Sequence, residues 1–80
     1  MVSFLNIGFD NMVSTDKIVA IISPDGASVK RLIQYSKENH LFIDATTGRK
    51  TRSVIITTDG YLFLSAIQSD TLVSRLNDIN

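Results

Sequence analysis

Two apolar, β-branched runs joined by a polar turn fill the middle of the chain. Runs of this kind, interrupted by Gly, Thr and Asp, predict two strands at residues 41–44 and 51–57 that return on each other. A second turn signal, Asp59-Gly60, precedes a third apolar run at residues 61–66. An Asp-Gly pair between apolar runs is typical of a β-hairpin. The centre of the chain therefore predicts three consecutive antiparallel strands.

The first part of the chain predicts two more strands. Residues 3–9 favour one strand that ends near Asp10-Asn11, a pair that favours turns. Apolar residues fall on both faces of this strand, so we expect it to be covered on both sides, by closure of the sheet or by another subunit. After a polar break at residues 14–17, the run Ile18–Ile22 predicts a central strand.

Two helices complete the predicted fold. Ser23 and Pro24 suit the N-cap and the first position of a helix. Because Gly26 weakens the first turn, the helix is expected to become regular only from Ala27, to run to about Glu38 and to end at a left-handed Asn39. A last short helix begins near Ser69 and has one apolar stripe. That stripe consists of Leu72, Val73, Leu76 and Ile79.

A length of 80 residues allows one small domain, residues 1–80. The predicted fold is α+β, a small antiparallel sheet with one central helix and a short C-terminal helix, in the order β-β-α-β-β-β-α. Domains of this size usually need a staple or a partner chain. The chain has no cysteine and a single histidine, His40, so no disulfide and no metal site are expected. Association with copies of itself is the expected extra source of stability.

Several classes of protein are disfavoured. No apolar run approaches the roughly 20 residues that cross a bilayer, and residues 1–6 lack the pattern of a signal peptide, so we expect a soluble, cytoplasmic protein. The segment Gly48-Arg49-Lys50 does not match a P-loop, because a P-loop needs an upstream glycine and a following helix. No hydroxyl has a histidine partner, so catalysis is not expected. One small core leaves little room for a cofactor or a small-molecule ligand.

The net charge is zero, but the charges are unevenly distributed. Residues 30–52 contain six Lys or Arg and two Asp or Glu, which is a net charge of +4. Residues 1–29 and residues 53–80 each have a net charge of −2. A basic block between acidic ends indicates an anionic partner for the middle of the chain.

Three cations, Arg49, Lys50 and Arg52, follow the first central turn, and we call them the basic ridge. Guanidinium groups offer a planar fork of donors to phosphate, and a lysine adds a point charge, so the basic ridge is a candidate phosphate-binding site. The alternative is a solvated hairpin end whose charges are balanced by Asp44 and Asp59. Spacing alone leaves both interpretations open. A second basic group is more typical of an ordinary helix surface and comprises Lys30, Arg31 and Lys37.

Several segments together resemble one family of small bacterial proteins, the RemA family, whose founding member is the extracellular matrix regulatory protein A. The most specific of them is Ile43-Asp44-Ala45-Thr46 followed by Gly48-Arg49-Lys50-Thr51-Arg52-Ser53-Val54-Ile55. The others are Phe4-Leu5-Asn6-Ile7-Gly8-Phe9 with Asn11 and Val13-Ser14, Ile22-Ser23-Pro24, Lys30-Arg31-Leu32-Ile33-Gln34, and Leu64-Ser65-Ala66 with Leu76. The resemblance covers nearly the whole chain.

The resemblance implies a DNA-binding transcriptional regulator that activates extracellular-matrix (biofilm) genes. It also implies a ring-shaped homo-oligomer, a heptamer or an octamer, with a subunit similar to the LytTR DNA-binding domain and double-stranded promoter DNA as partner. The family's DNA-contacting positions match Lys17, Arg49 and Lys50, and Arg52 is added here from the residues themselves, with Lys30 and Arg31 as secondary contacts. Lysine stands at 17 and 50 where the family leads us to expect arginine, which removes a bidentate fork.

A different class of function is also compatible with the residues. The protein could be a non-enzymatic structural or interaction module whose basic ridge binds an acidic protein partner. DNA binding predicts a steep fall of affinity with salt, because counterions are released from the duplex, whereas a protein interface is usually flatter.

Overall fold

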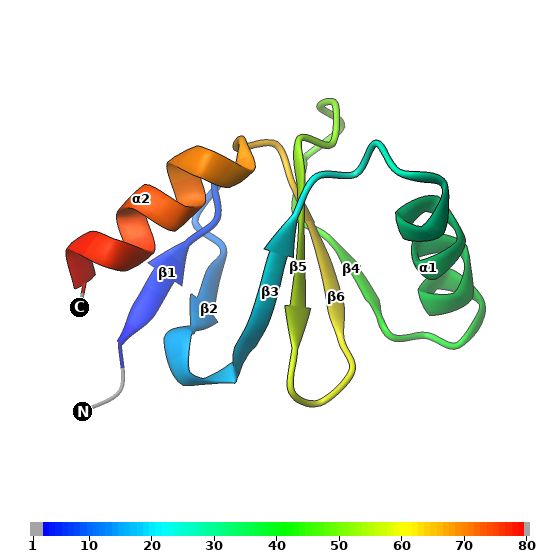
Figure 1. Cartoon of the computed structure of the whole chain (residues 1–80), viewed down its shortest axis with the longest axis horizontal. Coiled ribbons are helices and arrows are strands. Elements are labelled where there is room, and N and C mark those ends of the chain that lie inside the picture. Colours follow the sequence, from blue (N-terminus) through cyan, green and yellow to red (C-terminus); the bar gives the residue numbers. More distant parts are fainter. Residues whose placement is uncertain (1–2, 80) are drawn as a thin grey trace.

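The computed structural model describes residues 3–79 as two small sheets with two α-helices packed on them (Figure 1). Strands β1 and β2 pair with each other, and the second sheet has the strand order β3-β5-β6-β4. The fold is α+β, as the sequence predicts. The elements in chain order are β1 (Phe4–Asn6), β2 (Met12–Ser14), the 3₁₀-helix η1 (Thr15–Lys17), β3 (Ile18–Ile22), α1 (Ala27–Glu38), β4 (Phe42–Asp44), β5 (Ser53–Thr57), β6 (Leu62–Ser65) and α2 (Ser69–Ile79).

The hairpin predicted at Asp59-Gly60 is confirmed, because β5 and β6 pair antiparallel with Val54 opposite Leu64. The turn closes with the Gly60 N–H donating to the carbonyl of Thr57 at 3.0 Å. Gly60 has φ +83°, a left-handed conformation that glycine adopts without the steric cost of a Cβ. This hairpin forms the centre of the larger sheet.

The hairpin predicted between residues 41–44 and 51–57 is wrong. Strand β4 instead runs parallel to β6, with Phe42 opposite Leu62 and Asp44 opposite Leu64. Both edges of β5 are occupied, by β3 and by β6, so β4 does not pair with β5 and lies on the other edge of β6. The larger sheet is therefore mixed, with one parallel pair at its edge.

The regular part of α1 begins where predicted, but its N-cap differs. The helix begins at Ala27, and Gly26, in an extended conformation, is its N-cap. The N-cap predicted at Ser23 is wrong, because the Ser23 hydroxyl donates to the Asp25 carboxylate at 3.0 Å and accepts from the Asp25 N–H at 3.4 Å. These bonds make a local turn before the helix.

The predicted end of α1 at Glu38 is confirmed, but its cap differs. The left-handed residue is His40, with φ +58°, whereas Asn39 has φ −105°. The Asn39 side chain instead donates to the carbonyl of Tyr35 at 2.8 Å. Asn39 thus caps the helix with its side-chain amide, and the chain changes direction at the next residue, His40.

The predicted strand at residues 3–9 is shorter in the structure. Strand β1 ends at Asn6, and three consecutive residues with positive φ turn the chain back into β2. Strand β2 adds one strand to the predicted order. Leu5 lies opposite Val13, and both are buried, so the inner face of this two-stranded sheet is apolar.

Each face of the larger sheet has its own core. Helix α1 covers one face, where Val29 and Ile33 pack on a first cluster of buried residues: Val54, Leu62 and Leu64. The other face is covered by the β1–β2 sheet and by α2, and its buried residues are Leu5, Ile7, Val13, Ala45, Ile55 and Leu72. Adjacent residues of β5 supply the two cores because strand side chains alternate between faces.

The last helix begins at Ser69, as predicted, but only part of its apolar stripe is buried. Leu72 has no exposed surface, and Leu76 packs partly against the same core. Val73 and Ile79 are 41% and 38% exposed. The predicted apolar stripe thus contributes Leu72 and Leu76 to the core and leaves Val73 and Ile79 partly exposed.

Candidate nucleic-acid interface

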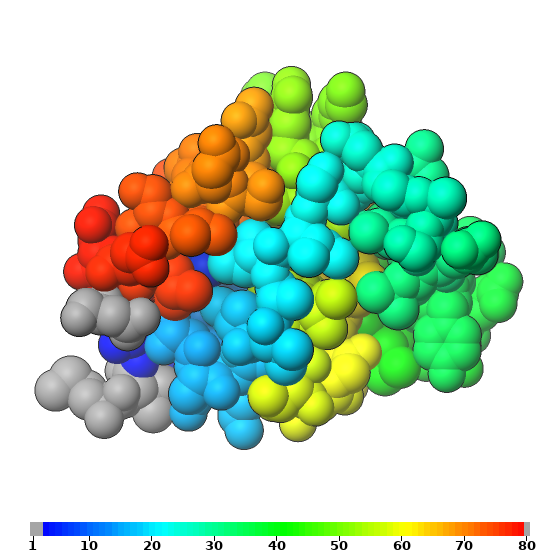
Figure 2. Space-filling view, viewed as in Figure 1, coloured from blue at the N-terminus to red at the C-terminus, as the bar shows by residue number. Residues whose placement is uncertain are grey.

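The basic ridge stands on a segment that crosses the end of a strand, and we call residues 45–52 the crossover loop. The loop leaves β4 on one side of β6 and enters β5 on the other side. Its two ends are fixed to β6, since the Ala45 N–H donates to the Leu64 carbonyl at 2.9 Å and the Arg52 N–H donates to the Ser65 carbonyl at 2.8 Å. The segment around residue 50 projects beyond the body of the molecule (Figure 2).

Hydrogen bonds within the crossover loop fix its shape. The Asp44 carboxylate accepts from the Thr46 N–H at 2.9 Å and from the Thr46 hydroxyl at 2.6 Å, and these bonds lower the pKa of Asp44 below its usual value of 3.8. Thr47 and Gly48 then both have positive φ, and the Arg49 N–H donates to the Thr46 carbonyl at 3.1 Å. The ridge thus begins directly after a tight, internally bonded turn.

The loop is buried at its start and exposed where the cations begin. Ala45 and Thr46 are 3% and 2% exposed, whereas the side chains of Arg49, Lys50 and Arg52 are all exposed. The three cations line a shallow hollow of about 470 Å³ together with Gly48 and Ala66. The structure therefore brings these three predicted site residues together.

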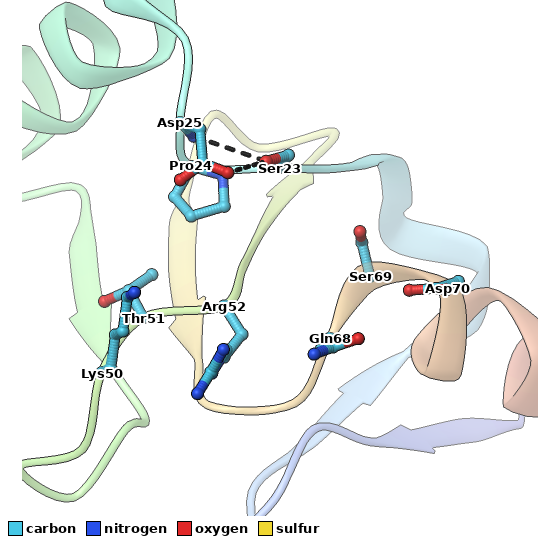
Figure 3. A pocket seen from close by; sticks show the side chains of 9 residues that line it. All are labelled: Ser23, Pro24, Asp25, Lys50, Thr51, Arg52, Gln68, Ser69 and Asp70. Carbon is cyan, nitrogen blue, oxygen red and sulfur yellow. Dashed lines mark hydrogen bonds between the residues drawn. The ribbon is translucent and has the colours of Figure 1, made fainter.

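A second hollow, of about 220 Å³, shares Lys50 and Arg52 with the first. Lys50 and Arg52 line it from the crossover loop, and the segments before α1 and at the start of α2 line its other sides (Figure 3). Asp25 and Asp70 are among its lining residues, so this hollow has mixed charge. The exposed, cationic part of the site is the projecting loop rather than the hollow behind it.

The carboxylates expected to balance the ridge are placed elsewhere or engaged. Asp44 accepts two hydrogen bonds from Thr46, and the cation that lowers its pKa through charge is Lys37. Asp59 lies in the β5–β6 turn, at the opposite end of the sheet from the crossover loop (Figure 1). The structure thus does not favour the interpretation in which Asp44 and Asp59 neutralise the ridge.

Lys17 is exposed and lies apart from the basic ridge. It is the last residue of η1, and its carbonyl accepts from the Thr58 N–H at 2.8 Å, which places it at the β5–β6 turn. It lines an apolar groove of about 300 Å³ that includes Met12 and Asp59. One subunit therefore does not bring Lys17 together with the ridge.

Lys30 and Arg31, the secondary candidates, lie in the first half of α1 and are exposed. Because β3 runs antiparallel to β5, α1 begins at the end of the sheet that holds the crossover loop (Figure 1). Lys30 and Arg31 therefore lie at the same end of the molecule as the basic ridge, but they line neither of the two hollows beside it.

Sequence reasoning missed one residue at this site. The ring of Phe9 lies beneath the guanidinium of Arg49, with 5.9 Å between the ring centroid and Cζ. Phe9 was expected inside a strand, whereas it occupies the β1–β2 turn and is 50% exposed. Gly8 and the pair Asp10-Asn11 on either side of it were the available signal, because such residues favour turns.

Residues 3–79 contain no candidate metal site and no candidate membrane-spanning helix. No group of three His, Cys, Asp or Glu side chains in this part of the chain could hold a metal ion. Neither described helix is long and apolar enough to span a membrane.

Comparison with known proteins decides the family. A family model described as "RemA-like: Extracellular matrix regulatory protein A-like" matches residues 4–76. The chain belongs to the RemA-like family. Relatives named "Putative regulatory protein" in Bacillus cytotoxicus, Bacillus cereus and Bacillus anthracis are each 51% identical to this RemA-like chain over 75 residues, which is 94% of this chain and 86% of each relative. The match includes every residue of the basic ridge and Lys17.

Proposed function

We propose that this RemA-like protein is a non-enzymatic, DNA-binding transcriptional regulator in the cytoplasm that activates extracellular-matrix genes. In this proposal the basic ridge contacts DNA phosphates, Lys17 adds a contact, and Lys30 and Arg31 are secondary contacts. The protein acts as a ring-shaped homo-oligomer, a heptamer or an octamer. The family description and the regulatory names of the relatives support the regulatory role.

The observation on which DNA binding rests is the crossover loop. Arg49, Lys50 and Arg52 are exposed together on a backbone that hydrogen bonds hold at both ends. A rigid arrangement of cations loses less conformational freedom when it binds a polyanion. Phosphate contacts of this kind fix a protein on a duplex, and sequence is then selected by base edges or by DNA deformability.

One subunit alone would bind weakly. Each neutralised phosphate contributes a slope of about −0.9 in a plot of log affinity against log salt, so three ridge cations give a slope of roughly −3. A ring repeats the ridge, and each bound loop raises the effective concentration of the next one. The proposed assembly therefore predicts a slope steeper than one subunit can give.

The outer face of the β1–β2 sheet is the proposed contact between copies. Because Asn6 lies opposite Met12 and Phe4 opposite Ser14, these side chains share the face that points away from the core. Phe4 and Met12 are 59% and 57% exposed, although both are apolar. A second copy of the chain would remove this surface from water.

The deciding experiment is a fluorescence-anisotropy titration of a long promoter duplex, repeated at several salt concentrations. We expect Arg49→Ala with Lys50→Ala to abolish binding while light scattering shows the same oligomer. Lys50→Ala and Lys37→Ala form a matched pair, since each removes one exposed lysine. Only Lys50→Ala should weaken binding and reduce the salt slope by about 1 for each bound subunit.

Four results would change the proposal. A shallow salt slope would favour an acidic protein partner over DNA. Dissociation of the oligomer by the ridge substitutions would reassign the ridge to the subunit interface. A monomer in the unaltered protein would remove the ring. Full assembly of a variant with Phe4→Glu and Met12→Glu would leave the ring in place and remove the β1–β2 sheet as the contact between copies.

A further inference from the structure

The turn between β1 and β2 has an unusual backbone. Gly8, Phe9 and Asp10 all have positive φ, at 105°, 53° and 65°. Aspartate and glycine tolerate this region, whereas a bulky aromatic residue rarely adopts it. The turn is held by the Asn6 side chain, which accepts from the Gly8 N–H at 2.8 Å, and by the Asn11 amide, which donates to the Gly8 carbonyl at 3.0 Å.

The strained backbone places Phe9 outside the core. Its side chain is 50% exposed, while Leu5 and Ile7 of the same segment are fully buried. The contact that distinguishes Phe9 is the guanidinium of Arg49, 5.9 Å from its ring centroid. An aromatic residue kept half-exposed at a strained position beside a functional cation indicates a role outside folding.

The geometry points to Phe9 as a positioning residue for Arg49. This inference rests on the proposed function, in which Arg49 contacts DNA. A guanidinium that lies over an aromatic face is attracted by the ring and keeps its N–H groups free at its edge. The ring thereby limits the orientations of Arg49 before DNA arrives, and the donors are presented in advance to a phosphate or a base edge.

The attraction between a cation and an aromatic face predicts which substitutions of Phe9 keep Arg49 in position. Phe9→Leu keeps an apolar side chain but removes the π face, whereas Phe9→Trp keeps a π face that attracts cations more strongly. A matched control is Tyr35→Leu, because Tyr35 is also an exposed aromatic residue, at 58%, and lies on α1 away from the ridge. Only the first of these three substitutions should weaken DNA binding.

The experiment measures the affinity of these variants for one promoter duplex at one salt concentration, with and without Arg49→Ala. We expect Phe9→Leu to weaken binding roughly two- to fivefold for each contacting subunit. In the Arg49→Ala background at low salt, where residual binding is measured, Phe9→Leu should have no further effect. Thermal unfolding by circular dichroism should change little, which separates positioning from a folding defect.

The outcomes separate this inference from the proposed function. If the unaltered protein binds no duplex at low salt, both are wrong. If the unaltered protein binds DNA, two results would make the inference alone wrong. Phe9→Leu could leave binding unchanged, or it could weaken binding equally with and without Arg49→Ala. Equal weakening in both backgrounds would make Phe9 a direct DNA contact or a contact to a second copy. Weaker DNA binding by Phe9→Leu and unweakened binding by Phe9→Trp would support the inference, provided that Phe9→Leu has no effect in the Arg49→Ala background.

Discussion

Ser65 joins the two sheets, and replacing it with alanine should destabilise the fold strongly. Its hydroxyl donates to the carbonyl of Ile7 at 2.7 Å and accepts from the N–H of Ile67 at 3.0 Å. Both Ser65 and Ile7 are fully buried. Ser65→Ala therefore leaves a buried carbonyl without its donor and an N–H without its acceptor, and water cannot easily replace the hydroxyl.

The expected cost follows from these two unpaired groups. Each buried polar group that loses its partner costs about 1–3 kcal/mol, and Ile67 is only partly buried, so we expect about 2–4 kcal/mol in total. An 80-residue domain has a free energy of unfolding of about 4–12 kcal/mol. At about 4–8 °C for each kcal/mol, Ser65→Ala should lower the melting temperature by at least 8 °C or so.

The assay is urea unfolding followed by circular dichroism, at one protein concentration for all variants because association also stabilises the folded state. Ser74→Ala is the control, since Ser74 is exposed in the middle of α2, and alanine there should be neutral or stabilising by a few tenths of a kcal/mol. A loss below about 0.5 kcal/mol for Ser65→Ala would refute the argument that these buried hydrogen bonds hold the sheets together.

Two further predictions concern the second core and the crossover loop. Leu72→Ala should lower the free energy of unfolding by about 2–5 kcal/mol because Leu72 is fully buried. Val73→Ala on the same helix should lower it by less than about 1 kcal/mol because Val73 is 41% exposed. Chemical denaturation compares the two variants, and similar losses would contradict this packing. The hydroxyl and N–H of Thr46 lower the pKa of Asp44 in the folded state, so its contribution to stability is present above the usual pKa of 3.8 and is lost as the pH falls through the folded value. Asp44→Asn should flatten the acid side of the stability curve, and an unchanged curve would show that this carboxylate is not coupled to folding.

Local signals in the sequence were sufficient for much of the fold. The pair Asp59-Gly60 predicted the β5–β6 hairpin because a left-handed glycine suits such a turn. The apolar run Ile18–Ile22 and the helical spacing after Ser69 predicted β3 and α2. Arg49, Lys50 and Arg52 fall within four consecutive residues of the sequence, and in the structure they line one hollow.

Local signals could not predict which strand β4 pairs with, nor the left-handed turn at Phe9. Strand β4 has three residues, and so short a run does not specify whether it pairs with β5 or with β6. The choice depends on β3, which occupies the other edge of β5 and precedes β4 by a whole helix. The left-handed Phe9 contradicts the preference of its residue type, so only tertiary contacts could reveal it.

The pairing of β4 with β6 also explains why the basic ridge stands where it does. In a hairpin of 41–44 with 51–57, Arg49 and Lys50 would have lain between the turn and the returning strand, at the mouth of the hairpin. The crossover loop instead spans the end of β6, so its cations gather at one end of the sheet. The pairing of β4 therefore moves the three cations from a hairpin mouth to a loop that crosses the end of a strand.

Lys17 completes the argument for a contact made by several copies. It lies at the β5–β6 turn, and the five residues of β5, at about 3.3 Å each, separate that end of the sheet from the crossover loop by roughly 16 Å. One subunit therefore offers a ridge of three cations and one separate lysine on a chain whose net charge is zero. A ring places equivalent groups at regular intervals, and a duplex that follows them meets many weak contacts at once. In the proposed assembly, affinity for DNA thus depends on how many subunits the duplex can reach, and its bending energy selects the sequences that can reach most of them.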